Sequence, residues 1–291
     1  MFFGSIPALV TPFSGGRVAE DTLRELVEWQ IEQGSTGLVP CGTTGEVATL
    51  GHDEHRQVIA TSVETARGRV PVIAGCGSYS TAASLEMIRA AADVGADAAL
   101  VVVPYYNKPS EAGLAAHFTT LADHSPLPIV VYNVPSRTVA DISVETLAVI
   151  AKHPKIVAIK DATGNLGRVS AQRLACGEDF IQLSGNDDMA LGFNAMGGVG
   201  CVSVTANVAP KLCADFQKAI HESRWDDALK LQDRLYPLHA ALFSDASPAP
   251  TKYALTRVRK GFPAELRLPL VEASEASKRI VDAALDHAGL T

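Results

Sequence analysis

The chain has 291 residues, of which 47% are hydrophobic and 20% charged, so it can bury a large core. Its net charge of −7 and its scattered Lys and Arg residues argue against nucleic acid or an anionic membrane as a partner. No apolar run reaches the ~18 residues of a membrane span, and the N-terminus lacks the features of a signal peptide, so we expect a soluble cytoplasmic protein.

Short apolar runs predict eight buried strands along the first three quarters of the chain. The runs have no polar face, which is typical of parallel strands that helices cover. The expected strands are residues 6–10, 37–41, 70–74, 98–103, 129–132, 156–160, 180–184 and 200–204.

Apolar residues at helical spacing lie between these strands. Leu23, Leu26 and Val27 share one helical face with Ile31, and Gly34 follows as a residue suited to the end of a helix. Three further stripes have the same spacing: Leu85, Ile88 and Ala92, with Ser80 as N-cap and Gly95 as the stop; Leu114, Phe118 and Leu121; and Leu212, Phe216 and Ile220.

Eight strands, each followed by a helix, predict a TIM (β/α)₈ barrel. An open doubly wound sheet is the alternative, because periodicity alone does not determine topology. After about residue 223 the strands cease, and residues 225–243, 250–261 and 274–288 are expected to be helical. We therefore predict a catalytic barrel in residues 1–223 and a small C-terminal helical region in residues 224–291.

Lys160 ends the sixth expected strand, at the edge of the barrel where such enzymes place their reacting groups. Partial desolvation of an amine at this position favours its neutral form. A neutral amine can attack a ketone to give an imine, which is an electron sink for carbanion chemistry. On position alone, an ion pair with Asp161 or another carboxylate is an equally good interpretation.

Hydroxyl and guanidinium groups follow neighbouring strands. Thr43 and the tyrosines at 105, 106 and 132 can pass protons without a histidine, although a single tyrosine at such an edge is more typical of rim packing. Arg137 offers a planar fork suited to a carboxylate. Together these side chains favour the imine chemistry.

Other candidate sites are weaker. The loop Gly42-Thr43-Thr44-Gly45-Glu46 lacks the Lys of a P-loop and suits a compact anion such as a carboxylate. His52 and His55 have no third ligand nearby, so we expect a solvated helix start and no metal site. The five cysteines form no C-x-x-C pair and are expected to be reduced and mostly buried.

Three segments resemble the signatures of the dihydrodipicolinate synthase and N-acetylneuraminate lyase family, and the resemblance extends over essentially the whole chain. The loop at residues 42–46 and the Pro-Ser-Arg-Thr sequence resemble the synthase branch of this family rather than its sugar-acid lyases. The segments are residues 42–46 (GTTGE), 132–138 (YNVPSRT) and 159–164 (IKDATG).

The resemblance implies condensation of pyruvate with L-aspartate 4-semialdehyde, at the entry to diaminopimelate and lysine biosynthesis, without a cofactor. Lys160 would form the imine and Tyr132 would donate and accept protons. Thr43 and Tyr106 would complete the relay, with Tyr106 reaching into the site of a neighbouring subunit. The implied assembly is a homotetramer, a dimer of tight dimers.

The resemblance also implies residues that bind the substrates. Thr44, Gly185 and the backbone at Val202 would hold pyruvate, and Arg137 would bind the carboxylate of aspartate semialdehyde. The alternatives are a lyase acting on a 2-keto-3-deoxy sugar acid, a barrel that binds a small carboxylate as a sensor, and a metal-dependent aldolase, which the missing ligand cluster disfavours.

One region departs from the synthases that lysine inhibits. The acidic residue that would pair with the lysine ammonium is Ala83 here, and an ammonium buried without its partner is costly. Inhibition by lysine is therefore expected to be weak or absent. The positions that match the inhibitor cleft read Val47, His55, Tyr79, Ala83 and Tyr105.

Overall fold

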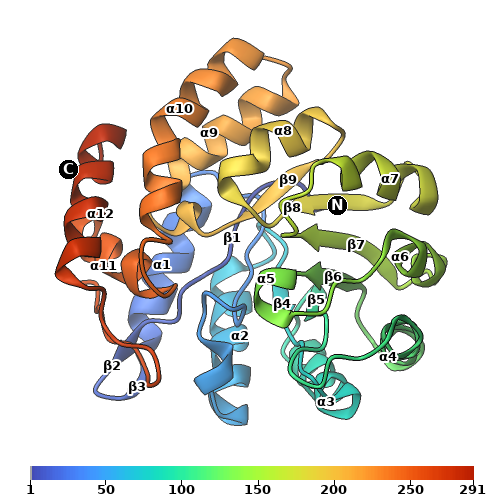
Figure 1. Cartoon of the computed structure of the whole chain (residues 1–291). Coiled ribbons are helices and arrows are strands. Elements are labelled where there is room, and N and C mark those ends of the chain that lie inside the picture. The colour runs from blue at the N-terminus through green and yellow to red at the C-terminus, as the bar shows by residue number, and fades with distance from the viewer. Residues whose placement is uncertain (1) are drawn as a thin grey trace.

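The computed structural model describes residues 2–291 and shows a ring of parallel strands enclosed by helices (Figure 1). Seven strands pair in parallel in the order β1-β9-β8-β7-β6-β5-β4. They are β1 (Gly4–Pro7), β4 (Ile73–Gly75), β5 (Ala98–Val102), β6 (Ile129–Asn133), β7 (Ile156–Asp161), β8 (Ile181–Ser184) and β9 (Gly200–Ser203).

The expected strand at residues 37–41 is shortened to two bridging residues, and these close the ring. Leu38 pairs with Val72 and Val39 with Ala8, both in parallel. The barrel prediction is thus confirmed, and an open sheet is excluded. The ladder has gaps here because three residues have no N–H to donate: Pro7, Pro40 and Pro71.

Helices cover the outside of the ring, and none in residues 2–291 is long and apolar enough to cross a membrane. The predicted stripe of Leu23, Leu26 and Val27 is buried, and Ser80 caps its helix by accepting from the Ala83 N–H at 3.3 Å. The helices are α1 (Glu20–Glu32), α2 (His52–Ala66), α3 (Thr81–Asp93), α4 (Glu111–His124), α5 (Pro135–Thr138), α6 (Val144–Ile150), α7 (Gly167–Cys176), α8 (Ala190–Ala195) and α9 (Pro210–His221).

Two apolar cores follow from the alternation of side chains along each strand. On β6, Ile129 and Val131 pack outward against helices, whereas Val130 and Tyr132 pack into the barrel interior. On β7 the interior residue is Ala158. Lys160 lies two residues further along, on the same face, so the strand itself directs the amine into the mouth of the barrel.

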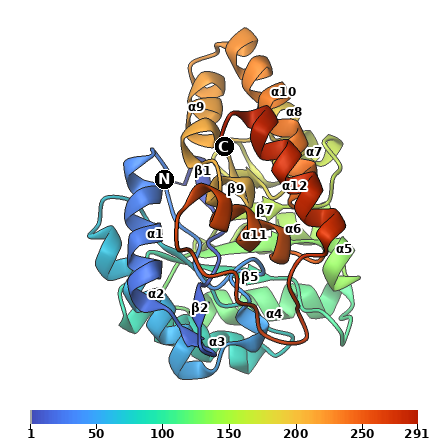
Figure 2. The same cartoon turned by 90° about the vertical axis from the view of Figure 1, so that its left-hand side faces the viewer.

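Three helices form the C-terminal region, where the sequence predicted them: α10 (Trp225–Ala241), α11 (Ala249–Val258) and α12 (Glu275–Ala288). Figure 2 shows α12 beside α10, and the chain after α11 passing across the barrel toward β2. In that chain Glu265 accepts from the N–H groups of Gly15 and Gly16, at 2.8 and 2.7 Å. Because the region packs on the barrel, the boundary at residue 223 stays a prediction.

A hairpin of two very short strands, β2 (Phe13–Ser14) and β3 (Arg17–Val18), was not predicted. Its turn is Gly15-Gly16, with φ of +58° and +78°, a conformation that glycine adopts readily in a tight hairpin. The strands are too short to produce an alternating apolar pattern, but the glycine pair is a signal that could have revealed the turn.

Candidate active site

A cavity of about 490 Å³ opens at the carboxyl ends of the barrel strands. Its walls come from β6, β7 and α5, from the segments that follow β8 and β9, from the loop at residues 43–44, and from α10. Most of the predicted site residues line it: Thr43, Thr44, Tyr132, Arg137, Lys160 and Gly185.

Lys160 and Tyr132 lie side by side in this cavity. They are register partners on the paired strands β6 and β7, and each is only 7% exposed. The Lys160 Nζ lies 4.1 Å from the centroid of the Tyr132 ring. The pairing of two strands therefore sets an amine against a phenol where substrate can enter.

The Lys160 amine is free of partners within residues 2–291, where no hydrogen bond or ion pair reaches Nζ. The adjacent Asp161 carboxylate instead accepts from the Thr163 N–H and from Gln172 Nε2, both at 2.8 Å. The ion pair between Lys160 and Asp161, which the sequence left open, is not formed. The amine is available to a substrate.

Gly185 gives the Lys160 side chain its room. A Cβ at this position would lie 2.7 Å from the Ala162 Cβ and 3.2 Å from the Lys160 Cε. Any larger residue would displace the amine or its strand, since the first distance is shorter than real Cβ contacts. The predicted role of Gly185 in binding pyruvate is compatible with this place beside the amine.

Arg137 stands at the rim of the cavity, in the short helix α5. Its side chain is exposed, and within residues 2–291 it forms no ion pair or hydrogen bond through its guanidinium. A free planar fork beside a cavity is suited to a substrate carboxylate. Arg137 thus lies at the cavity, and its role in binding a carboxylate stays a prediction.

Tyr106 and Val202 are not among the residues that line the cavity. Tyr106 is 93% exposed, and its φ of +68° is a left-handed conformation that is strained for an aromatic residue. Val202 packs in the barrel interior, and Val204 lines the cavity instead. The roles of Tyr106 and Val202 stay predictions.

An acid and an imidazole that line the cavity, Asp187 and His239, were not predicted from the sequence. The buried Asp187 accepts from the N–H groups of Val204 at 2.8 Å and Thr205 at 3.2 Å, which fixes the chain after β9. His239 of α10 bonds through Nδ1 to the Thr205 hydroxyl at 2.8 Å. Burial lowers the pKa of His239, while the Asp187 and Asp188 carboxylates act in the opposite direction.

Among residues 2–291 no group of three or more His, Cys, Asp or Glu side chains is placed to hold a metal ion. The expectation of a solvated turn is wrong for His55, which is buried with Nε2 2.7 Å from the Gly75 carbonyl oxygen. Burial lowers its pKa. The cysteines are free, and all but the half-buried Cys176 are buried.

Comparison with known proteins gives a consistent result. The model of the dihydrodipicolinate synthetase family matches residues 1–288. The 4-hydroxy-tetrahydrodipicolinate synthase of Zymomonas mobilis subsp. mobilis is 66% identical over 290 residues, covering 100% of both chains. A solved dihydrodipicolinate synthase from Acinetobacter baumannii, described as complexed with pyruvate, is 41% identical with a TM-score of 0.97 and 100% coverage of both chains. A solved structure described as a monomeric dihydrodipicolinate synthase variant is 37% identical, with a TM-score of 0.96 over 100% of this chain and 98% of that one.

Proposed function

Since the chain belongs to the dihydrodipicolinate synthetase family, we propose that Lys160 is the residue that carries pyruvate in its reaction. That reaction is the condensation of pyruvate with L-aspartate 4-semialdehyde to 4-hydroxy-tetrahydrodipicolinate, the entry to diaminopimelate and lysine biosynthesis. The observation that carries the proposal is the unpartnered Lys160 amine, 4.1 Å from the Tyr132 ring centroid and open to the cavity.

The proposed mechanism begins with the addition of the neutral Lys160 amine to the C2 carbonyl of pyruvate. Loss of water gives the imine, and loss of a proton from C3 gives the enamine. C3 then bonds to the aldehyde carbon of the second substrate, whose oxygen takes up a proton. The amino group of that substrate adds to C2 and displaces the Lys160 nitrogen, so the ring closes and the enzyme is released.

During imine formation the oxygen on C2 of pyruvate must gain protons so that it can leave as water. We assign this proton transfer to Tyr132. Its ring lies against the amine, and Thr43 lines the same cavity. Thr44 and Gly185 are the proposed contacts of pyruvate, with the backbone at Val202 as a further contact. No step of this mechanism needs a metal or cofactor, because the imine nitrogen is itself the electron sink.

Replacing Tyr132 by Phe tests this assignment. We expect kcat to fall about a hundredfold, because removing a positioned proton donor typically costs this much or more. The ring contact with Lys160 is retained, so borohydride should still trap pyruvate, but more slowly. Steady-state kinetics and single-turnover trapping measure the two effects, and an unchanged kcat would remove Tyr132 from the relay.

Arg137 is the proposed binding residue for the carboxylate of the aldehyde. Within residues 2–291 its fork has no hydrogen bond or ion pair, and it lines the same cavity as the Lys160 amine. The competing substrate class, the 2-keto-3-deoxy sugar acids, would present hydroxyl groups at this place rather than a carboxylate. Turnover with each substrate class separates the two: sugar-acid cleavage faster than condensation would favour the lyase.

The assembly we propose is a homotetramer in which Tyr106 completes the site of a neighbouring subunit. A tyrosine 93% exposed in a strained conformation is well explained if a second copy covers it. Sedimentation of wild type and of Tyr106→Phe tests the proposal, with slower turnover but an unchanged assembly expected for the variant. A cytoplasmic location, which suits the free thiols, belongs to the same proposal.

L-lysine is expected to inhibit this enzyme weakly or not at all. Tyr79 stacks edge-on against Tyr105 at 5.4 Å between ring centroids, and Ala83 brings no carboxylate to this part of α3. An ammonium would enter without a partner, which is unfavourable. A dose–response curve with L-lysine checks this, and strong inhibition at low concentration would show that another residue supplies the charge.

The imine itself is tested by borohydride reduction of the wild-type protein in the presence of pyruvate. Mass spectrometry should find the pyruvate adduct on the peptide that contains Lys160. Turnover in a sample whose Lys160 stays unmodified would contradict the proposed function. A protein that neither turns over nor traps pyruvate would favour the carboxylate sensor.

A further inference from the structure

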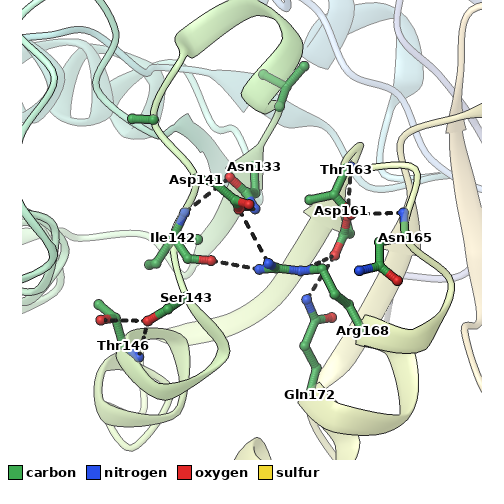
Figure 3. Close-up of polar contacts among 12 residues, drawn as sticks. Asn133, Asp141, Ile142, Ser143, Thr146, Asp161, Thr163, Asn165, Arg168 and Gln172 are labelled. Atoms are coloured by element: carbon green, nitrogen blue, oxygen red, sulfur yellow. Dashed lines mark hydrogen bonds and ion pairs between the residues drawn. The ribbon is translucent and has the colours of Figure 1, made fainter.

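A guanidinium group bridges two segments just outside the active-site cavity (Figure 3). It belongs to Arg168 of α7, whose side chain is 13% exposed and does not line the cavity. Nη2 donates to the Ile142 carbonyl oxygen at 2.6 Å, and Nη1 lies 3.3 Å from Asp141 Oδ1. On the other side, Nε lies 3.5 Å from Asp161 Oδ2. Arg168 therefore ties residues 141–142 to the end of β7.

A buried amide joins the same segment to β6. Asn133, fully buried, donates from Nδ2 to Asp141 Oδ1 at 2.7 Å and accepts from the Ile142 N–H at 3.4 Å. Asn133 follows Tyr132 directly, and its register partner on β7 is Asp161. The two strand ends that carry the proposed catalytic side chains thus share one polar network with residues 141–142.

The two sides of this network depend on Arg168 to different degrees. Asp161 keeps two good donors without it, Gln172 Nε2 and the Thr163 N–H, both at 2.8 Å. Its distance to Arg168 is the longest in the network and has ion-pair rather than hydrogen-bond geometry. Within residues 2–291, the polar contacts left to Asp141 and Ile142 without Arg168 are their bonds with Asn133, and the buried Ile142 side chain keeps its packing. Loss of Arg168 would therefore loosen residues 141–142 more than β7, the strand that carries Lys160.

Residues 134–140, which lead from β6 to residues 141–142, carry Arg137. Between Asn133 and Asp141 the chain forms only the four-residue helix α5, followed by Val139, which is 70% exposed at a left-handed φ of +60°. Val134, Thr138 and Ala140 are buried, whereas Arg137 and its neighbours Ser136 and Val139 are exposed. The position of this exposed turn depends on how the segment is held at its two ends. The first end is fixed by β6, and the second by the buried Ile142 side chain, by the bonds of Asn133 and by Arg168.

We propose that Arg168 is a positioning residue for the acceptor substrate: by fixing residues 141–142 it places Arg137, and so it sets the affinity for the aldehyde carboxylate without taking part in imine formation. The inference rests on the proposed function. It predicts that loss of Arg168 changes the KM for aspartate semialdehyde but not the KM for pyruvate. A general structural role would not produce this difference.

Arg168→Met tests this difference, since it keeps most of the side-chain length and removes the fork. We expect the KM for aspartate semialdehyde to rise roughly tenfold, because small misplacements of a positioning group have effects of this size or larger. The KM for pyruvate and the borohydride adduct on Lys160 should stay as in wild type. Arg168→Lys should recover only part of the loss, because a point charge cannot bridge both sides.

Arg173→Met is the matched control. Arg173 lies on the same helix and also donates to a backbone carbonyl, that of Met196, but it has no link to β6, β7 or the α5 segment. Its loss should leave both KM values unchanged. An equal rise of the aldehyde KM in this variant would overturn the proposal, as would an unchanged value or a lost pyruvate adduct in Arg168→Met.

Two further variants keep the test decisive. If Arg168→Met does not fold, Asp141→Asn removes the charge that Arg168 holds and should raise the same KM by a smaller factor. In Arg137→Met/Arg168→Met the KM should stay close to that of Arg137→Met, because both residues act on one subsite; additive effects would contradict this. A wild type that fails to trap pyruvate refutes the proposed function, whereas normal trapping with an unaltered aldehyde KM in the variants refutes only the role of Arg168.

Discussion

Replacing Lys160 by Ala should lower turnover of pyruvate and aspartate semialdehyde by roughly 10⁴-fold or more, in line with the loss of other covalent nucleophiles. The reason is that every later step takes place on carbon atoms activated by the imine nitrogen. Tyr132 would still occupy its place, but it would have no covalent intermediate to protonate. Among residues 2–291 no second lysine lines the cavity to take over this role.

The measurement is a steady-state assay combined with borohydride trapping and mass spectrometry. Lys155→Ala is the matched control, because Lys155 stands just before the same strand, where it is half-buried, does not line the cavity and donates to the Pro126 carbonyl oxygen at 3.2 Å. This control should keep both its turnover and its adduct. Rapid catalysis by Lys160→Ala, or an adduct on another lysine in wild type, would show that the amine chemistry lies elsewhere.

The barrel and its central amine were predictable because both depend on local periodicity. An apolar run such as residues 156–160 is buried on both faces, and its last side chain shares a face with Ala158. Because side chains alternate along a strand, Lys160 must point into the barrel, and this can be read from the strand alone. The same argument placed Tyr132, its partner on the next strand.

Contacts between distant parts of the chain could not be predicted in this way. His239 and Phe243 reach the cavity from a region expected to be separate from the barrel, and no local pattern links them to Thr205. The Arg168 network was missed for the same reason, since its members are spread over β6, β7, α7 and a loop. The shortened strand at residues 37–41 could have been anticipated from its prolines.

A buried ion pair between Glu46 and Lys252 connects the C-terminal region to the active-site loop. Both side chains are fully buried, and Lys252 Nζ lies 2.5 Å from Glu46 Oε1. Lys252 also donates to the Glu265 carbonyl oxygen at 2.7 Å, and Glu46 Oε2 accepts from the Arg267 N–H at 3.1 Å. Glu46 closes the turn that begins at Thr43, because its N–H donates to the Thr43 carbonyl oxygen at 3.1 Å.

Lys252→Met should therefore destabilise the protein by about 3–5 kcal/mol, the usual cost of leaving one member of a buried pair without its partner. For a chain of this size that corresponds to a fall of roughly 10 °C in the thermal midpoint. Turnover should fall as well, because the loop with Thr43 and Thr44 loses its anchor. Thermal unfolding and steady-state kinetics on the same samples measure both effects.

Lys260→Met is the control for this change: Lys260 is exposed just beyond α11, and its loss should alter stability by less than about 0.5 kcal/mol. If Lys252→Met is no worse than this control, the pair does not hold the loop.

A double variant separates the charge from the packing. Burial lowers the pKa of Lys252, and the Glu46 carboxylate acts in the opposite direction. A buried pair of this kind is costly to break but is not strongly stabilising as a whole, because taking two charges out of water is itself costly. Glu46→Gln/Lys252→Met, which leaves no unpaired charge, should consequently be more stable than Lys252→Met alone. If the activity of the double variant nevertheless stays low, the ion pair serves mainly to set the conformation of the Thr43–Thr44 loop. If its activity recovers together with its stability, filling the space between α11 and that loop is sufficient.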